Sequence, residues 1–429
     1  MTPADRQRDS AGGAPPPRRA LPTAPEPWTY ARGPGVTAPR RRPRRRRGPG
    51  WRSIFGLAVL ATVLAVWTWA GSPQTATPRG RPALRLPPAP RAGSRPAALF
   101  THPLSRPALR PGSDPAALPG PILIADSANN RLLVVSPRGQ VLWRFPGPAG
   151  LPTGQTFIAP DDAFFTPDGR SIVATQETDS AISLIAVGSR RIIFRYGVSG
   201  VPGAGPNHLA NPDDAQLIDG RDLLAADIEN CRLVVIAPGT HVLARAFGET
   251  TSACLHQPPR RFGSPNGAFP MGGGDVLVTE INGDWVDVMT LTGRIVRQLH
   301  PPGVLYPSDT NLVRPGVLLT ADYSWPGQVV MFTLQGRTLW RYRPTGANAL
   351  DHPSLALPLP NGDVLINDDR NDRVIVVDPR TDRIVWQYGV TGVPGSAPGF
   401  LNVPDGVDLA PPYSEDITRG RAAAPVGPR

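Results

Sequence analysis

Six copies of a strand–turn–strand pattern, separated by proline-containing links, predict an all-β fold for most of this chain. The link prolines are 42 to 53 residues apart. A period of that length, built only from strands, is typical of the four-stranded blade of a β-propeller. An uncharged apolar run near the N-terminus predicts one membrane-spanning helix. The sequence therefore predicts a six-bladed β-propeller that follows one N-terminal transmembrane helix and has disordered flanks.

The N-terminal segment, residues 1–52, is expected to be a disordered, Arg-rich cytoplasmic tail. It holds 13 arginines and 3 acidic residues, whereas the part of the chain from residue 121 onward holds 25 arginines and 30 acidic residues. The net charge of +11 therefore comes from the N-terminal part. A domain that binds nucleic acid carries its basic residues on the folded surface, so we expect no nucleic-acid partner.

The transmembrane prediction covers residues 53–70, SIFGLAVLATVLAVWTWA, which contain no charge. As a helix this run spans roughly 27 Å, close to the hydrocarbon thickness of a bilayer. The arginines at 40–52 predict that its N-terminal end stays in the cytoplasm and that the remainder is exported. A cleaved signal peptide is the alternative, but the preceding segment is much longer than the short basic region of such peptides. We expect a single-pass protein of the cell membrane, with its propeller outside the cytoplasm.

Two further segments flank the repeats. Residues 71–120 are rich in Pro, Ala, Arg and Gly, with little apolar periodicity, and predict an extended stalk. Residues 413–429 predict a short disordered tail. The propeller is expected over 121–412.

The repeated unit is a hairpin followed by a third strand. The six hairpins are ILIADSANNRLLVV (122–135), SIVATQETDSAISLI (171–185), DLLAADIENCRLVVI (222–236), DVLVTEINGDWVDVM (275–289), VLLTADYSWPGQVVM (317–331) and DVLINDDRNDRVIVV (363–377). A further short strand follows each link proline, and the prolines are Pro160, Pro212, Pro265, Pro307, Pro353 and Pro404. The last of these strands has no hairpin after it, and the first hairpin has no such strand before it. The C-terminal strand is therefore predicted to complete the first blade and close the ring, which removes exposed sheet edges.

The hairpins ADSANNRLLVV and DDRNDRVIVVD resemble the NHL-type propeller repeat, in which an acidic residue precedes a polar turn with Asn and then Arg. Asp378, Thr381 and Trp386 in DPRTDRIVW are similar to the PQQ-like blade motif of quinoprotein propellers. NHL-type propellers serve as binding platforms, lyases and other enzymes, so the resemblance implies the fold and leaves the activity open. Quinoprotein dehydrogenases typically have eight blades, and no cofactor-binding set matches this chain. We therefore expect neither PQQ nor another cofactor.

Polar residues directly follow the link prolines and are expected to converge at one mouth of the central channel. Carboxylates there can hold a cation or a polar ligand through oxygen contacts. The alternative is local turn chemistry, since Asp, Asn and Ser cap their own backbone. The candidate ligand-binding residues are Asp161, Asp162, Asp213, Asp214, Asn266, Asp309 and Asp405. A second set, one per hairpin, is expected to anchor the turns: Asp126, Gln176, Asp227, Glu280, Asp322 and Asp368.

His352 is the one candidate catalytic residue. It lies in DHPSLALPLPNGD, which resembles the His-bearing segments of propeller-type aryl sulfotransferases. That resemblance implies a nucleophile or base, while the alternative is a link histidine that bonds the backbone. No HxH or HExxH pair occurs, so the sequence predicts no metal site.

Cys231 and Cys254 are the two cysteines of the chain. If the propeller is exported, oxidation is permitted, and a disulfide would hold the long insertion after the third blade's hairpin. Two free thiols remain the alternative.

The sequence favours a non-catalytic binding or scaffold module, tethered to the membrane, for an envelope protein or a small polar ligand. The motivation is the clear repeat and the stalk. The alternative is a propeller enzyme, sulfotransferase-like, lyase-like or a degenerate quinoprotein, with its site at the channel mouth. The two differ in what converges there: His, Arg and carboxylate together favour the enzyme.

Overall fold

The computed structural model describes residues 100, 102–239, 242–251 and 253–412. The predicted tail at 1–52, the apolar run at 53–70 and the C-terminal tail at 413–429 lie outside these residues. Within the described part, no helix is long and apolar enough to cross a membrane.

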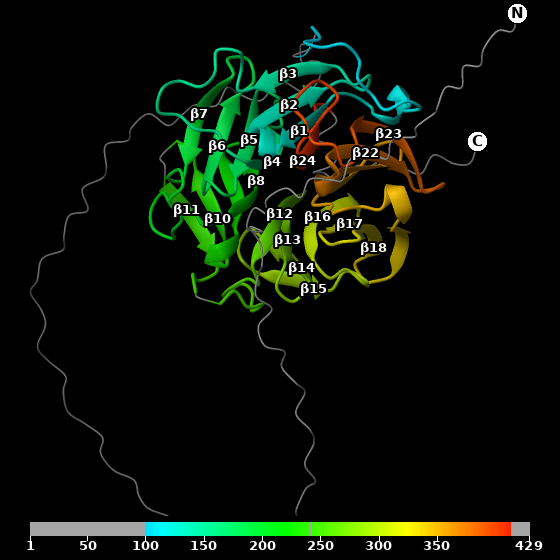
Figure 1. Ribbon diagram of the computed structural model, residues 1–429. Helices are drawn as coiled ribbons and strands as arrows, with labels where there is room; N and C mark the ends of the chain where they lie inside the picture. Colours follow the sequence, from blue (N-terminus) through cyan, green and yellow to red (C-terminus); the bar gives the residue numbers. More distant parts are fainter. Residues whose placement is uncertain (1–99, 101, 240–241, 252, 413–429) are drawn as a thin grey trace, which may run out of the picture. The chain divides into compact units, whose positions relative to one another are not determined.

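Six four-stranded antiparallel sheets form the fold, and the prediction of an all-β, six-bladed β-propeller is confirmed. In each sheet the strand that follows the link proline lies next to the axis (Figure 1). The first three blades, from the axis outward, contain β24 (Pro404–Leu409), β1 (Ile122–Asp126), β2 (Arg131–Val135) and β3 (Val141–Phe145); β4 (Pro160–Phe165), β5 (Ser171–Gln176), β6 (Ala181–Ala186) and β7 (Arg191–Tyr196); β8 (Pro212–Ile218), β9 (Asp222–Asp227), β10 (Arg232–Ala237) and β11 (Val242–Phe247).

The remaining three blades repeat this order. They contain β12 (Pro265–Gly272), β13 (Asp275–Glu280), β14 (Trp285–Thr290) and β15 (Ile295–Leu299); β16 (Pro307–Arg314), β17 (Val317–Asp322), β18 (Gln328–Thr333) and β19 (Thr338–Tyr342); β20 (Ala356–Pro358), β21 (Val364–Asp368), β22 (Arg373–Asp378) and β23 (Arg383–Gly389). Short 3-10 turns are η1 (Pro115–Ala117), η2 (Ser127–Asn129), η3 (Ile228–Asn230), η4 (Gly346–Asn348) and η5 (Asp369–Asn371).

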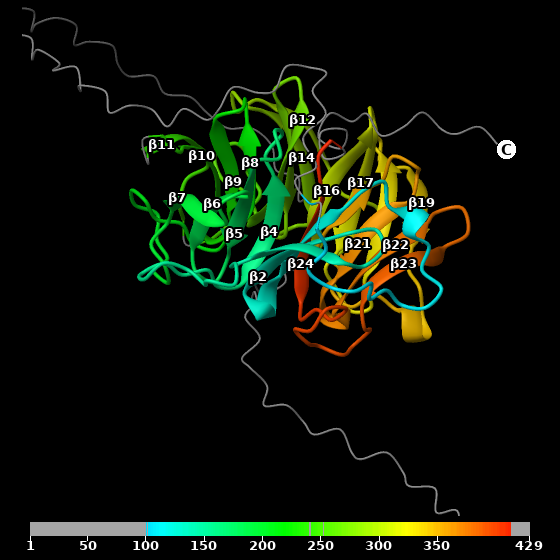
Figure 2. The same ribbon diagram turned by 90° about the horizontal axis from the view of Figure 1, so that it is seen from above.

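The ring closes as the sequence predicts, because the C-terminal strand β24 pairs antiparallel with β1. Ile122 is opposite Leu409, and Ile124 is opposite Val407. In Figures 1 and 2 the red β24 lies beside the first blade. The first blade is thus built from both ends of the domain, so that closure depends on a contact between segments almost 300 residues apart in sequence.

The hydrophobic core lies between neighbouring blades. Trp143 and Phe145 of the first blade pack with Phe157 and Phe165, which belong to the link and first strand of the second. Because each blade is covered on both faces, its middle strands are buried at nearly every position, as in β1 and β5. This explains why the hairpins have runs of Val, Ile and Leu rather than strict alternation.

The last part of the segment predicted as stalk packs against the propeller. The backbone N–H of Leu104 donates to the carbonyl of Val141 (2.7 Å), and that of Asp114 donates to the carbonyl of Val385 (2.8 Å). The segment therefore follows the outer strands β3 and β23 and satisfies polar groups on their free edges. The prediction of an extended stalk over 71–120 did not include these contacts, nor the burial of Ala117 and Leu118 in the core, because two apolar residues and main-chain pairing leave no periodic pattern in the sequence.

Buried ion pairs fix the hairpin turns of the first, third and sixth blades. In the sixth, Arg373 donates from Nε to Asp368 Oδ2 at 2.7 Å, and Asn371 donates to the same oxygen at 2.9 Å. Asp126 and Asp227 are bonded in the same way by the Asn and Arg of their own turns, Asn129 and Arg131, and Asn230 and Arg232. The recurring Asp, Asn and Arg of the repeat are therefore one unit: the buried carboxylate orders the turn, and the Arg compensates its charge.

We predict that Arg373→Met lowers the free energy of unfolding by about 3–5 kcal/mol, because it leaves Asp368 buried without its counter-ion. The matched control is Arg380→Met, because the Arg380 side chain is 74% exposed and solvent screens its ion pair with Asp378. Urea unfolding of both variants measures the difference, and equal losses would contradict this account of the turn.

Candidate functional site

The innermost strands carry a β-bulge at the point where they leave the link. In β4, Pro160 pairs with Gln176 and Ala163 with Ala174, so two residues of β4 are opposite the single residue Thr175. The same shift occurs in β8, β12 and β16, and beside β24. A bulge breaks the strict alternation of a strand and redirects its side chains. Both polar residues after a link proline can therefore reach the axis.

Three aspartates from three blades meet at the axis: Asp162 of β4, Asp214 of β8 and Asp309 of β16. One carboxylate oxygen of each lies within 4.8 Å of those of the other two. A second group, with the same limit, consists of Asp161, Asp162 and Asp213. We call these five residues the axial aspartates. The two groups share Asp162, so they form one continuous cluster.

Glycines at equivalent positions make room for this cluster. A Cβ at Gly267 would lie 2.8 Å from Asp309 Oδ1, and a Cβ at Gly406 would lie 2.6 Å from Asp162 Oδ1. Real side chains do not tolerate such distances without a shift of their neighbours. The second position after the link proline is thus Asp or Gly in five blades and Leu355 in the sixth.

The carboxylates of the cluster are buried and incompletely satisfied. Asp309 is 1% exposed, and neither of its oxygens has a hydrogen-bond partner among the described residues. Oδ1 of Asp162 and Oδ1 of Asp214 also have none in this part of the chain, although Asp214 Oδ2 accepts from the backbone N–H of Ala268 at 2.9 Å. Buried polar groups are normally paired, so these oxygens need either protons shared among the carboxyl groups or a bound cation.

Burial and mutual repulsion shift the titration of these groups. Burial, with the neighbouring carboxylates, raises the pKa of Asp162, Asp214 and Asp309 well above the usual value. Burial raises the pKa of Asp213 to about 7. Without a cation the cluster must therefore hold protons near neutral pH, whereas with one it can ionise.

An all-oxygen site of this kind fits a hard divalent cation. Calcium takes 6 to 8 oxygen ligands at about 2.3–2.6 Å, so two ligands on one ion are at most about 5 Å apart. The separations within the axial aspartates meet that limit. Imidazole or thiolate ligands, which softer metals prefer, do not belong to either group.

The other predicted residues have different roles. Asp405 lies near Asp161 and Asp369, and burial raises its pKa. Asn266 donates to Ser308 Oγ at 3.1 Å, and Ser354 donates to the carbonyl of Asp405 at 2.7 Å. Asn266 therefore links two blades by a side-chain hydrogen bond, which is not the capping of its own backbone that the turn-chemistry alternative describes.

Sequence reasoning missed Glu177 and Asp369 at the same mouth. Burial, followed by the charges of Asp213 and Asp405, raises the pKa of Glu177 well above its usual value. Asp369 is fully buried, and its pKa is raised by burial and by Asp405. Both residues come directly after a hairpin anchor, Gln176 and Asp368. An acidic residue directly after the hairpin anchor could have indicated these two sites. In other blades, however, this position is apolar, as at Ile228 and Ile281.

His352 lies in the link before β20, in a left-handed conformation with φ 54°. Its Nδ1 is 2.6 Å from Asp351 Oδ1, and its ring packs edge-on against Tyr323 with centroids 4.9 Å apart. Burial, followed by the charges of Asp405 and Asp369, raises the pKa of Tyr323 well above its usual value. An imidazole oriented by a carboxylate through Nδ1 can act as a base through Nε2.

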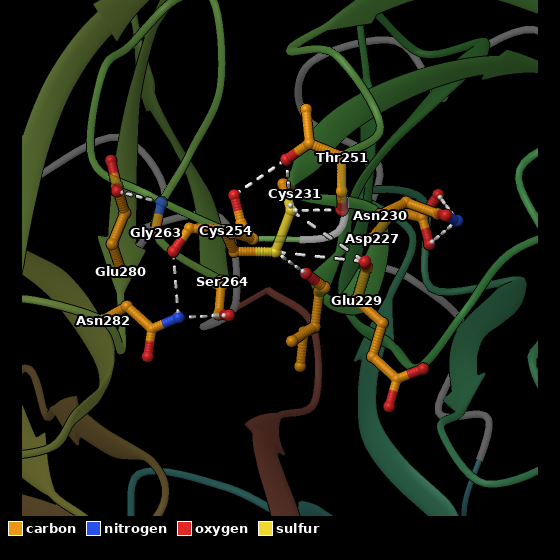
Figure 3. The surroundings of a disulfide bond; sticks show 12 residues. Asp227, Glu229, Asn230, Cys231, Thr251, Cys254, Gly263, Ser264, Glu280 and Asn282 are labelled. Carbon is orange, nitrogen blue, oxygen red and sulfur yellow. Dashed lines mark hydrogen bonds between the residues drawn. A yellow bond between two sulfur atoms is a disulfide. The ribbon is translucent and has the colours of Figure 1, made fainter. Parts of the chain in front are cut away.

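A disulfide joins Cys231 and Cys254, with Cα atoms 5.0 Å apart (Figure 3). It ties the insertion after the third blade to the start of β10. Asn282 of the fourth blade donates to the carbonyl of Cys254 at 3.1 Å and to Ser264 Oγ at 2.9 Å. The insertion is therefore held between two blades.

The fold defines the chain as a six-bladed β-propeller. No protein-family model matches it, and no curated protein matches it in sequence. Among solved structures it is similar to a protein of unknown function from Bacteroides caccae (15% identity, TM-score 0.48, covering 67% of this chain and 98% of that one). It is also similar to virginiamycin B lyase from Staphylococcus aureus (16%, 0.38, 53% and 69%) and to hydrazine synthase of Kuenenia stuttgartiensis (16%, 0.41, 61% and 77%). Likenesses at this level do not extend to activity.

We predict that the cation-free domain loses stability as the pH rises. The folded pKa of Asp213, about 7, is above its unfolded value of 3.8, so the folded state binds the proton more tightly. This contribution is fully present below pH 4 and is lost as the pH rises through 7, and it is on the order of a few kcal/mol.

Urea unfolding in the presence of a chelator, from pH 5 to pH 8, measures this slope. Asp213→Asn should reduce this slope, because one of several buried carboxylates with a raised pKa is removed, whereas the exposed Asp219→Asn should leave it unchanged. A wild-type slope of the opposite sign between pH 6 and 8 would contradict the buried-carboxylate account.

Proposed function

We propose that this protein is a non-catalytic binding module whose axial aspartates hold a divalent cation, calcium in the first instance, at one mouth of the propeller. The observation that carries the proposal is the set of buried, unpartnered oxygens on Asp162, Asp214 and Asp309. The buried arginines of the hairpins pair with other carboxylates, namely Asp126, Asp227 and Asp368. A bound cation supplies the charge that the protein does not.

The cation serves two purposes in this proposal. It cross-links strands from three blades, and so it stabilises the ring around its axis. Its remaining coordination positions, directed toward the mouth, bind an oxygen-bearing ligand such as a carboxylate, a phosphate or a sugar hydroxyl. Asp161, Asp213 and Asp405 are the protein groups nearest to that ligand.

We predict that Ca²⁺ raises the Tm of the propeller at pH 8 and that Asp309→Asn abolishes the increase. At about 100 times its Kd, a ligand stabilises the folded state by about 2.7 kcal/mol, which raises the Tm of a domain of this size by roughly 4 °C. The amide of the variant can donate to neighbouring carboxylates, so its cation-free Tm should be equal to or above that of the wild type. Thermal unfolding with Ca²⁺, Mg²⁺ and chelator measures both effects.

Asp219→Asn is the matched control, because Asp219 is exposed and outside the cluster. It should keep the full response to Ca²⁺. If none of Ca²⁺, Mg²⁺ and Mn²⁺ changes the wild-type Tm at pH 8, the axial site is not a cation site.

We also propose that residues 53–70 anchor the chain in the cell membrane, with the propeller outside the cytoplasm. The support is the uncharged run, the arginines before it, and a disulfide in the propeller. Disulfides persist in oxidising compartments and are rare in the cytosol. A membrane-tethered propeller would present its mouth to an envelope protein or a polar ligand.

We predict that the full chain stays with the membrane after alkaline extraction, and that Leu60→Arg with Val63→Arg releases it, because two charges at the centre of the run oppose insertion. The control pair, Ala83→Arg with Leu84→Arg, adds the same charge outside the run and should not release it. Recovery of the wild-type chain in the soluble fraction would rule out the anchor.

A further inference from the structure

The fourth blade departs from the hairpin pattern of its neighbours. In the first, third and sixth blades, the anchoring Asp is paired across the turn with Arg131, Arg232 or Arg373. In the fourth blade the anchor is Glu280, and the residue paired with it is Trp285. The arginine that compensates the buried charge in those three blades is replaced here by a neutral ring, whereas in the fifth blade the amide of Gln328 takes its place opposite Asp322 and donates to it.

A second buried carboxylate follows on the same strand. Asp287 lies two residues after Trp285, at a position that is apolar in four other blades and Ser183 in the second; the apolar residues are Leu133, Val234, Val330 and Ile375. It is fully buried, and its oxygens make no hydrogen bond of good geometry in the described part of the chain, although the Glu280 and Gln298 side chains lie near enough to shift its pKa; Oε1 of Glu280 has no partner there either. An apolar residue would fit this position, so the carboxylate needs a separate explanation.

The disulfide-bound insertion brings a histidine to these two carboxylates. His256, two residues after Cys254, has its Nδ1 3.0 Å from Glu280 Oε2 and 4.0 Å from Asp287 Oδ2. Its ring stacks on Trp285, with centroids 4.1 Å apart and planes within 7°. Figure 3 shows Glu280 beside the insertion that the disulfide holds.

We propose that His256 Nδ1, Glu280 and Asp287 form a binding site for Zn²⁺ or a similar divalent transition metal. Two donor atoms on one tetrahedral zinc ion lie about 3.4 Å apart. This value falls between the distances from His256 Nδ1 to Glu280 Oε2 and to Asp287 Oδ2, which are 3.0 and 4.0 Å. One imidazole and two carboxylates suit zinc better than calcium, in contrast to the all-oxygen axial cluster. The charge of +2 on the ion balances the charge of −2 on the two carboxylates. The fourth coordination position of the ion is left for water or a ligand.

Gln298 completes the surroundings of the site. It lies opposite Asp287 on β15, and its side-chain amide is 2.7 Å from His256 Nε2. A histidine that binds a metal through Nδ1 carries its proton on Nε2 and donates it to an outer partner. With the amide oxygen turned toward the ring, Gln298 accepts that proton and orients the imidazole. Gln298 is therefore a positioning residue.

A shared proton is the competing explanation for the two carboxylates. Burial raises the pKa of Glu280 to about 7, and burial with the nearby Glu280 charge raises that of Asp287 to about 8. One proton held between them would also relieve their repulsion. The two explanations make different predictions for metal binding, so the experiment separates them.

Isothermal titration with Zn²⁺, after metals have been removed, tests the proposal. The protein is the segment 100–429, provided that it unfolds cooperatively. If it does not, the full chain in detergent is used. We expect wild type to bind Zn²⁺ at this site, and Asp287→Asn or His256→Gln to weaken that binding by more than about 100-fold. Gln298→Ala should weaken it by about 10–100-fold, as changes in outer partners do. Reduction of the Cys231–Cys254 disulfide should weaken it as well, because the insertion that carries His256 is released.

Two controls keep the outcome clear. His208→Gln removes a half-buried histidine of the link before the third blade and should keep the Zn²⁺ response of wild type. Asp287→Val restores the apolar residue of the sister blades, so it should fold and fail to bind. If wild type does not bind Zn²⁺, or if Asp287→Asn binds it equally well, the shared proton is the correct explanation and the metal site is wrong.

Discussion

The compensation of buried negative charge is the constraint on which this propeller depends. Its blades place carboxylates in the interior at the hairpins, at the axis and in the fourth blade. In the hairpins of three blades an arginine forms an ion pair with the buried carboxylate, as Arg373 does with Asp368. Asp214 and Asp408 receive backbone N–H groups. At the axis, and at Asp287, the oxygens left over have no such partner among the described residues. Those are the two places where we propose a metal ion.

Because the blades repeat one another, equivalent positions in different blades can be compared directly. Each blade supplies a control for the others, because equivalent positions share their backbone geometry and differ only in side chain. Only the fourth blade has an aromatic residue opposite its hairpin anchor and a carboxylate two residues later; the second blade has Ala181 and Ser183 there, and the fifth has Gln328 and Val330. The Gly at 267 and 406, beside aspartates that need the space, is a second departure of this kind. Function is thus indicated by departures from the repeat, while the repeat itself maintains the fold.

The six hairpins, the link prolines and the closing strand could be predicted from the sequence, because each is a local pattern repeated at a fixed period. The axial residues could be predicted as candidates for the same reason. The pattern Pro-Asp-Asp, however, does not reveal the bulge that turns Asp162 toward the axis. His256, Glu280 and Asp287 share no local spacing, since a disulfide-bound insertion brings the histidine to the strands. The packing of Leu104 and Asp114 on the outer strands is main-chain pairing, for which composition gives no signal.

Diffraction from crystals of the domain soaked in Mn²⁺ at pH 8 tests the central claim most directly, because the anomalous signal locates the ion itself. The account predicts an anomalous peak on the axis, about 2.0–2.6 Å from carboxylate oxygens of Asp162, Asp214 and Asp309. An axis without anomalous density, with these carboxylates hydrogen-bonded to one another through shared protons, would contradict it.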